Sequence, residues 1–130
     1  MLFNGVIIQI TRESEAIVKV KDHFPVDIEE DITYKTDKAI MINISRGFVQ
    51  KGKEIKLFNV LSFEEAIGKL QLKSIIVHHG DSPKGGHYTA YIIHDGTWYH
   101  YNDMEGYEFI GMIKNMKKDD AKNIVALFYL

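Results

Sequence analysis

One segment of the sequence holds a histidine and an asparagine that a β-hairpin would bring together. The dipeptide Asp95-Gly96 lies between two aromatic-rich runs and is the strongest hairpin signal in the chain. A two-residue turn at this point places Thr89 opposite Asn102, with His87 two residues before Thr89 on the same face. Diagonal neighbours in such a strand pair lie about 7–8 Å apart. The spacing therefore predicts an imidazole and an amide at the open end of the hairpin.

An imidazole beside an amide can serve acid–base chemistry. A side-chain oxygen that accepts from one ring N–H fixes the tautomer, and the other nitrogen of His87 is then free to activate a nucleophile. Gly85-Gly86, directly before this histidine, allows a close approach of the backbone or a swinging loop. The alternative interpretation is structural: His87 and Asn102 simply close the end of a strand pair.

The elements that would position these residues are mainly strands, because apolar and polar residues alternate with period two and turn residues separate the runs. The predicted strands are Gly5–Ile10, Ala16–Lys21, Lys38–Ser45, Glu54–Val60, Leu70–His78, Tyr88–His94, Thr97–Tyr101, Glu108–Ile113 and Asn123–Tyr129. Helix is limited to one turn from the capping box at Ser62 through Ala66 and a second over Lys117–Lys122. The pattern predicts a single, mainly antiparallel β domain over residues 1–130.

Composition narrows the classes of function. The 130 residues are enough for one domain, and they carry a net charge of −2 with 26% charged residues. Nucleic-acid-binding proteins usually show a strong basic excess. The richest basic run, Lys114–Lys118, is followed at once by Asp119 and Asp120 and reads as a solvated turn. We therefore expect no nucleic-acid partner.

The sequence contains no cysteine. These residues can therefore supply no disulfide, no Cys-ligated zinc and no thiol nucleophile. The first residues show no signal-peptide pattern, and no apolar run approaches the roughly 20 residues of a membrane span. We expect a soluble protein of the cytoplasm or nucleus that has no membrane partner.

Other ligands fit the pattern poorly. Four histidines, His78, His79, His87 and His100, could approach one another near the hairpin, but adjacent His78 and His79 point to opposite sides of a strand and no carboxylate completes a metal site. The aromatic residues of Tyr88–Asp103 are accompanied by no Lys or Arg, so we interpret them as core rather than as a base-stacking platform. We expect no metal and no cofactor.

Three stretches together resemble the histidine box of ubiquitin-specific proteases, which are papain-like cysteine proteases. They are Val77–Gly80, Gly85–Tyr91 and Trp98–Asp103. The surrounding strands continue the similarity at Ala39–Arg46, Lys53–Phe58, Leu70–Val77 and Val125–Tyr129. The resemblance is good over residues 39–130 and fainter over residues 1–38. It implies the palm subdomain of such a protease, an antiparallel sheet or half-barrel.

The resemblance also implies roles for individual residues. His87 matches the general base of the family, Asn102 the residue that orients it, and Asp103 the acidic position that often follows. The stretch from His78 to Gly86 matches a mobile loop beside the channel for the ubiquitin C-terminus. The ligand-binding positions implied in this way are His78, Gly85, Gly86, Tyr88, Tyr91 and Trp98.

The sequence departs from the family pattern at three points. No cysteine box or helical thumb is present, the short segment Asp31–Asp37 stands where zinc-binding fingers would lie, and the usual Arg-Phe reads Arg46-Gly47-Phe48. Nothing places the hydroxyl of Ser82 to replace the missing thiol. We therefore expect a fingerless, thumbless palm whose face around His87, Tyr91, Trp98 and His100 is partly open or covered by something else.

These features predict a catalytically inactive protein-binding module for ubiquitin, a ubiquitin-like protein or a scaffold partner. One alternative is the histidine-bearing half of a split deubiquitinase whose nucleophile comes from another chain. A second alternative is an architectural subunit of a large assembly. An open face would be covered by a second copy, by a thumb-bearing chain or by a larger complex.

Overall fold

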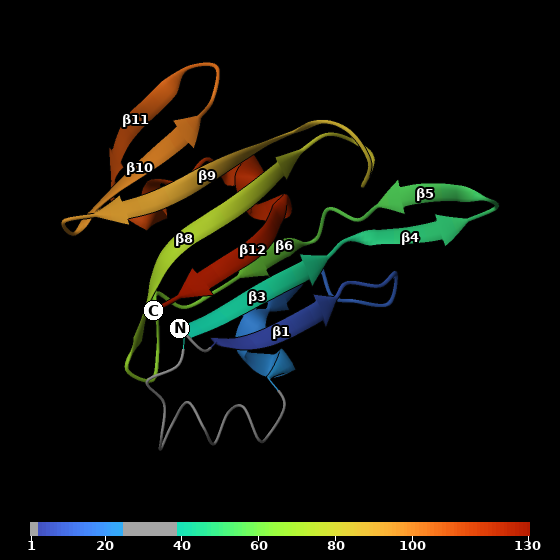
Figure 1. Ribbon diagram of the computed structural model, residues 1–130. Helices are drawn as coiled ribbons and strands as arrows, with labels where there is room; N and C mark the ends of the chain where they lie inside the picture. Colours follow the sequence, from blue (N-terminus) through green and yellow to red (C-terminus); the bar gives the residue numbers. More distant parts are fainter. Residues whose placement is uncertain (1–2, 25–38) are drawn as a thin grey trace.

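The period-two alternation of the sequence becomes one large, twisted sheet. The structure, a computed structural model, describes residues 3–24 and 39–130. The sheet follows the order β1 (Phe3–Gln9), β3 (Ala39–Ser45), β12 (Ile124–Tyr129), β8 (Leu70–His79), β9 (His87–His94), β10 (Thr97–Asn102) and β11 (Gly106–Gly111), with β7 (Ala66–Ile67) paired to β8 (Figure 1). Within this sheet only β1 and β3 pair in parallel, which the sequence did not indicate. The predicted mainly β half-barrel is confirmed.

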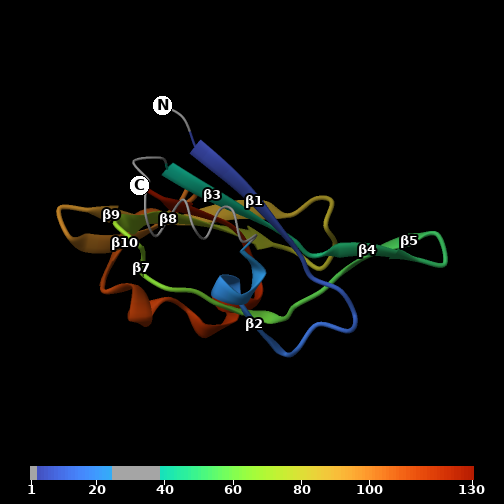
Figure 2. The same ribbon diagram turned by 90° about the horizontal axis from the view of Figure 1, so that it is seen from below.

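Short elements lie on one side of this sheet. They are the parallel pair β2 (Ile17–Lys19) and β6 (Val60–Ser62), and the 3-10 helices η1 (Val20–His23), η2 (Ile113–Asn115) and η3 (Lys118–Lys122). The antiparallel hairpin of β4 (Gly47–Gln50) and β5 (Lys53–Lys56) instead projects beyond the end of the sheet (Figures 1 and 2). No helix in the described ranges is long and apolar enough to cross a membrane.

The core lies between the sheet and the short elements. One row of paired residues crosses five strands there: Ile42, Leu127, Ile75, Tyr91 and His100. Each of these side chains is buried. Val20 of η1 and Ile113 of η2 close the same cluster from the opposite side. Because alternate residues of a strand face opposite sides, every second residue along these strands points away from this core.

The predicted hairpin register is confirmed. Thr97 pairs with His94, and the pairing continues without a shift to Tyr101 and Ala90. Asp95 and Gly96 both adopt positive φ, 49° and 77°, as a two-residue hairpin turn of the favoured type requires. The turn sequence therefore sets the position of every side chain along β9 and β10.

Three predicted elements differ from the structure, one helical turn and two strands. The helical turn at Ser62–Ala66 is wrong, because both ends of the segment belong to strands. Ser62 ends β6, where it pairs with Lys19, and Ala66 begins β7, where it pairs with Gln71. The turn at Lys117–Lys122 is confirmed as η3.

The predicted strand Glu54–Val60 is interrupted after Lys56, and β4 was not predicted. The predicted strand Ala16–Lys21 is shortened to β2, with η1 following. Asp31–Asp37 lies outside the described residues.

The expectation of an open face at Tyr91, Trp98 and His100 is wrong. Their exposed fractions are 0%, 3% and 5%. The connection from β11 to β12, which carries η2 and η3, covers this side of the sheet and contributes Ile113 to the core. Only His87, at the start of β9, is exposed among the four residues of that predicted face.

Arg46 connects the large sheet to the segment that follows the β4–β5 hairpin. Its guanidinium is buried and donates to four backbone carbonyls, those of Ile124, Leu57, Asn59 and Ala121, at 2.7–3.4 Å. Burial lowers the pKa of Arg46 to about 10, so it stays charged at neutral pH. The bonds to Leu57 and Asn59 explain why the strand breaks between β5 and β6.

We expect Arg46→Met to lower the free energy of unfolding by at least about 3 kcal/mol, because buried carbonyls lose their donors. Urea unfolding followed by circular dichroism measures this change. The exposed Arg12 provides the control, and Arg12→Met should stay within about 0.5 kcal/mol of the parent. Equal effects of the two substitutions would contradict this role for Arg46.

Candidate functional site

The candidate site lies where β8 ends and β9 begins. His79 and His87 are paired residues at this point, and residues 80–86 form the loop that joins the two strands. The two imidazoles stack with their centroids 4.8 Å apart and their planes at 17°. His87 is exposed, and no hydrogen bond to another described residue engages its ring nitrogens. The structure thus presents the predicted base to solvent, resting on a second imidazole.

A threonine hydroxyl anchors that second imidazole. Thr89 is buried, and its Oγ1 lies 2.7 Å from Nε2 of His79 and 3.1 Å from Nε2 of His100. A hydroxyl can donate to one ring nitrogen and accept from the other. Thr89 therefore links the stacked pair of His79 and His87 to the buried His100.

Beneath this link lies a buried tyrosine–aspartate pair. The Tyr91 hydroxyl donates to Oδ2 of Asp120 at 2.5 Å and accepts from the backbone N–H of Lys117 at 3.2 Å. Burial, with the bond to Asp120, raises the pKa of Tyr91 well above its ordinary value of 10. His100 stacks on the Tyr91 ring at 4.4 Å and lies 3.9 Å from Asp120 Oδ2. This pair ties η3 to the centre of the sheet.

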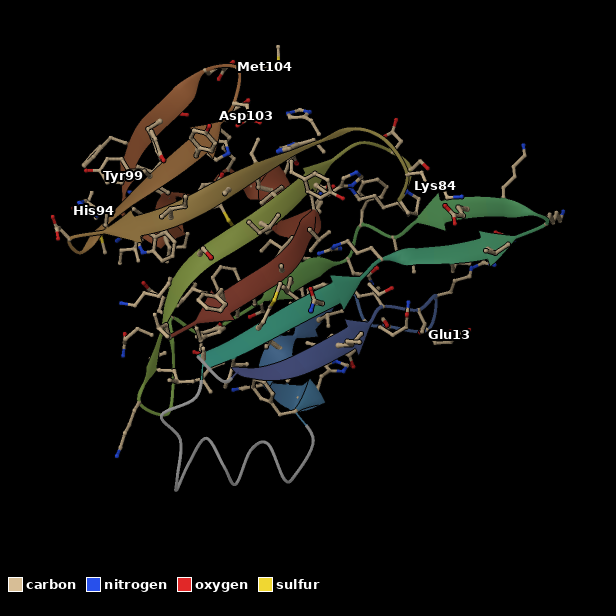
Figure 3. All side chains as sticks on the ribbon, in the orientation of Figure 1. Glu13, Lys84, His94, Tyr99, Asp103 and Met104 are labelled. Carbon is tan, nitrogen blue, oxygen red and sulfur yellow. The ribbon has the colours of Figure 1, made fainter. Side chains whose placement is uncertain are left out.

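Asn102 is the last residue of β10, at the predicted end of the hairpin. Its Oδ1 accepts from the backbone N–H of Met104 at 3.0 Å, so the amide oxygen caps the following turn. Among the described contacts it makes no hydrogen bond with His87. Asp103 lies exposed beside Met104 at the turn into β11 (Figure 3), and its bond with the Tyr101 hydroxyl raises the pKa of that phenol.

A buried lysine anchors the histidine loop. Nζ of Lys56 lies 3.1 Å from Nδ1 of His78 and donates to His78 O, Gly80 O and Asn123 Oδ1 at 2.8, 3.0 and 2.7 Å. Burial lowers the pKa of Lys56 below its ordinary 10.5. An ammonium group has three N–H donors and no acceptor, so its three protons are shared among these four acceptors. Nδ1 of His78 must therefore accept, and Nε2 must carry the ring proton. Nε2 then donates to Gly85 O at 2.5 Å.

The glycine pair before His87 is required by this closure. Gly86 has φ +85°, and a Cβ at this position would overlap the carbonyl oxygen of His79. Only glycine lets the returning strand approach so closely. The structure therefore gives His78, Gly85 and Gly86 a part in holding the loop shut at its base.

The loop lies against the β4–β5 hairpin. The ring of Pro83 fills the space beside Gly47, and Nζ of Lys84 lies 3.7 Å from Oε1 of Glu54 (Figure 3). Loop and hairpin therefore form one continuous rim at the end of the sheet where His87 lies.

The other predicted positions divide by exposure. Tyr88 is 60% exposed and borders the rim, whereas Tyr91 and Trp98 are buried and present no surface to a ligand. Within residues 3–24 and 39–130, no group of three or more His, Asp or Glu side chains could hold a metal ion.

Sequence reasoning missed Lys56, His79, Thr89 and Asp120 as site residues. For Lys56, the only available signal was its place in the alternating pattern of a predicted strand. Asp120 lies in a charged run that was interpreted as a solvated turn.

Comparison with known proteins shows which family and which proteins this chain is similar to. A family profile described as Ubiquitin carboxyl-terminal hydrolase matches residues 6–129. Ubiquitin carboxyl-terminal hydrolase 3 of Mus musculus and its counterpart of Homo sapiens are each 53% identical to this chain over 32 residues. That stretch is 25% of this chain and 6% of each relative.

The Lys56 anchor generates a first prediction. We expect Lys56→Met to cost about 2–3 kcal/mol of stability and to speed amide exchange at His79 and His87, because three oxygens and one ring nitrogen lose their donor. Hydrogen-exchange NMR measures both. Lys53→Met, an exposed lysine on the same strand, is the control and should leave the exchange unchanged. Unaltered exchange in Lys56→Met would contradict the anchor.

The partly buried imidazole of His79 leads to a prediction for the pH dependence of stability. Burial lowers the pKa of His79 below 6.5, so the unfolded chain holds this proton more tightly. The contribution of His79 to stability is therefore complete above about pH 6.5 and is lost as the pH falls through the lower, folded-state pKa. We expect His79→Gln to flatten the loss of stability between about pH 7 and pH 5. Chemical unfolding across this range, with exposed His94→Gln as control, checks it; equal slopes in His79→Gln and the parent would refute it.

Proposed function

The chain belongs to the ubiquitin carboxyl-terminal hydrolase family, and from this premise we propose that it is a non-catalytic module that binds ubiquitin or a ubiquitin-like protein at the rim beside His87. The observation that carries the proposal is a family histidine region in a sequence of 130 residues without cysteine. A histidine base contributes typically about 10²–10⁴-fold in rate and acts only on a nucleophile. Without a thiol in these residues, binding is the part of the family's activity that they can perform.

The exposed residues at the rim support a binding role. His87 and Tyr88 are adjacent and exposed, and the loop 80–86 and the β4–β5 hairpin flank them. A tyrosine offers a large apolar ring with a polar tip, and such residues are enriched at protein interfaces. This arrangement suits an extended peptide tail that lies along the rim.

The anchored loop also favours binding. Lys56 and His78 tie both ends of the loop to the body of the domain before any partner arrives. A preordered loop loses less conformational entropy when it binds. The rim can therefore hold a flexible tail with few contacts, although with modest affinity.

A second candidate function rests on the exposure of His87. The described contacts leave its ring nitrogens unengaged, while His79 supports the ring from behind. Such a residue is accessible to a thiol brought by another polypeptide. In this alternative the chain is the histidine-bearing half of a split deubiquitinase, and Asn102 turns from the Met104 amide to orient His87.

Titration of isotope-labelled ubiquitin with this chain tests the proposal. We expect saturable NMR shifts at the ubiquitin C-terminal tail, with a dissociation constant near about 1 mM. Tyr88→Ala should abolish saturation, because truncation of an interface tyrosine commonly costs about 1–2 kcal/mol. Ile7→Ala removes a similarly exposed apolar side chain, 76% against 60%, on β1 at the opposite edge of the sheet and should bind as the parent does.

The remaining outcomes separate the alternatives. Absence of shifts at high concentration would refute ubiquitin binding and favour another partner or an architectural role. Hydrolysis of a ubiquitin-tail substrate by the purified chain, reduced by His87→Ala, would refute the non-catalytic proposal. Cleavage that appears only when a thiol-bearing partner chain is added would favour the split enzyme.

A further inference from the structure

The face of the large sheet that points away from the core is mainly apolar, with Ser74 and Asn43 as polar members of its rows. A row of directly paired residues crosses it: Met41, Phe128, Ser74, Ile92, Tyr99 and Phe109. A second row continues the pattern with Ile76, Ala90, Tyr101 and Tyr107. Neither row contains a charged residue. Figure 1 looks onto this face, and in Figure 2 the labelled short elements β2 and β7 lie on the other side of the sheet.

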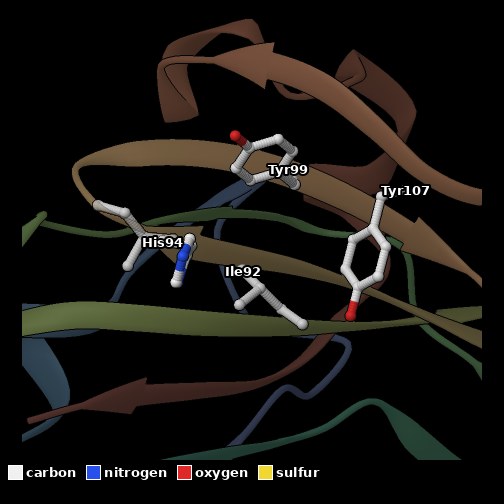
Figure 4. A pocket seen from close by; sticks show the side chains of 5 residues that line it. Ile92, His94, Tyr99 and Tyr107 are labelled. Carbon is white, nitrogen blue, oxygen red and sulfur yellow. The ribbon is translucent and has the colours of Figure 1, made fainter.

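The β9–β11 part of this face carries both protruding side chains and a hollow. Tyr107 and Phe109 are 68% and 70% exposed, and both meet the ring of Tyr99 edge-on. Beside them lies a pocket of about 420 Å³, which includes Ile92, His94, Tyr99 and Tyr107 in its lining (Figure 4). Protruding aromatic side chains (the knobs) and this apolar pocket (the hollow) therefore occur together on neighbouring strands.

We propose that this face is the contact surface of a homodimer in which two copies of the chain stack sheet against sheet. A twofold interface uses the same patch on both subunits, so the patch must be complementary to itself. The knob at Phe109 and the hollow beside Tyr99 meet this requirement, since each copy offers both. Aligned sheets pack about 10 Å apart with their strands near −30° to one another, a distance that single layers of side chains fill.

The charge distribution selects a second copy as the occupant. A partner of opposite charge would need charged groups on this face, and the two rows supply none. The net charge of −2 also leaves little repulsion between two copies. Apolar packing alone can therefore hold the interface.

The available area sets the strength of the dimer. A Phe or Tyr side chain buries about 150–250 Å². Two such rings at roughly two-thirds exposure, together with fractions of their half-buried neighbours, make about 500 Å² per copy. A standard stable interface buries about 800 Å² per partner. The dimer is therefore concentration-dependent rather than permanent.

This inference does not rest on the proposed ubiquitin binding. His87 shares the core-facing side of β9 with Thr89 and Tyr91, whereas Ile92 belongs to the opposite face. Tyr88 alternates onto the same outer face as Ala90 and Ile92, but a copy stacked over Tyr99, Tyr107 and Phe109 leaves His87 accessible. Either property can fail without the other.

Sedimentation velocity of the full chain from about 1 µM to about 1 mM tests the dimer across the range of weak to moderate interfaces. We expect the weight-average mass to rise from 15.0 kDa toward twice that value. Phe109→Lys and Tyr107→Lys should each weaken association at least tenfold, because dimerisation would bury an unpaired ammonium. Both side chains are exposed, and circular dichroism confirms that each variant folds.

Val49→Lys is the matched control, because Val49 is 68% exposed but lies on the projecting β4–β5 hairpin. It should dimerise as the parent does. A mass that stays at 15.0 kDa over the whole range overturns the proposal. A dimer that survives both Phe109→Lys and Tyr107→Lys, or that Val49→Lys disrupts equally, overturns the assignment to this face.

Discussion

The buried ammonium group of Lys56 is the constraint on which the candidate site depends. Its described partners are two backbone carbonyls, an amide oxygen and a ring nitrogen of His78, all of them uncharged. A buried cation without such partners would cost several kcal/mol. The chain must therefore bring Gly80 and Asn123 to one point, and this closes the base of the loop before His87. Arg46 repeats the principle nearby, with carbonyl partners in the segment after β5, in η3 and at the start of β12.

From this anchor a chain of contacts runs across the core-facing side of the sheet. His78 holds Gly85, the glycine pair turns the backbone into β9, and His87 then lies on His79. Thr89, His100, Asp120 and Tyr91 continue the polar contacts inward to η3. The exposed histidine is thus the outer end of a network whose inner end is buried. Its surroundings are rigid because each polar group beneath it has a partner.

The two faces of the sheet differ in how they are covered. The core-facing side is sealed by η1, η2 and η3 and keeps only its end at His87 open. The opposite face keeps a mainly apolar surface with exposed aromatic rings at β11. Large apolar patches on soluble domains commonly mark interaction surfaces. One strand, β9, therefore links the candidate site at its start with the proposed dimer face along its outer side.

The sequence alone was enough for the strands, the hairpin register and the family. These depend on local signals: period-two alternation, the Asp95-Gly96 turn and a long histidine box. It was not enough for the helical turn predicted at Ser62–Ala66, because pairing with distant segments places Ser62 in β6 and Ala66 in β7. Nor did it reveal that Tyr91 and Trp98 are buried, since the segment that covers them is distant in sequence. The roles of Lys56, Thr89 and Asp120 arise only when residues 10 to 67 positions apart meet, and that meeting is a property of the tertiary structure.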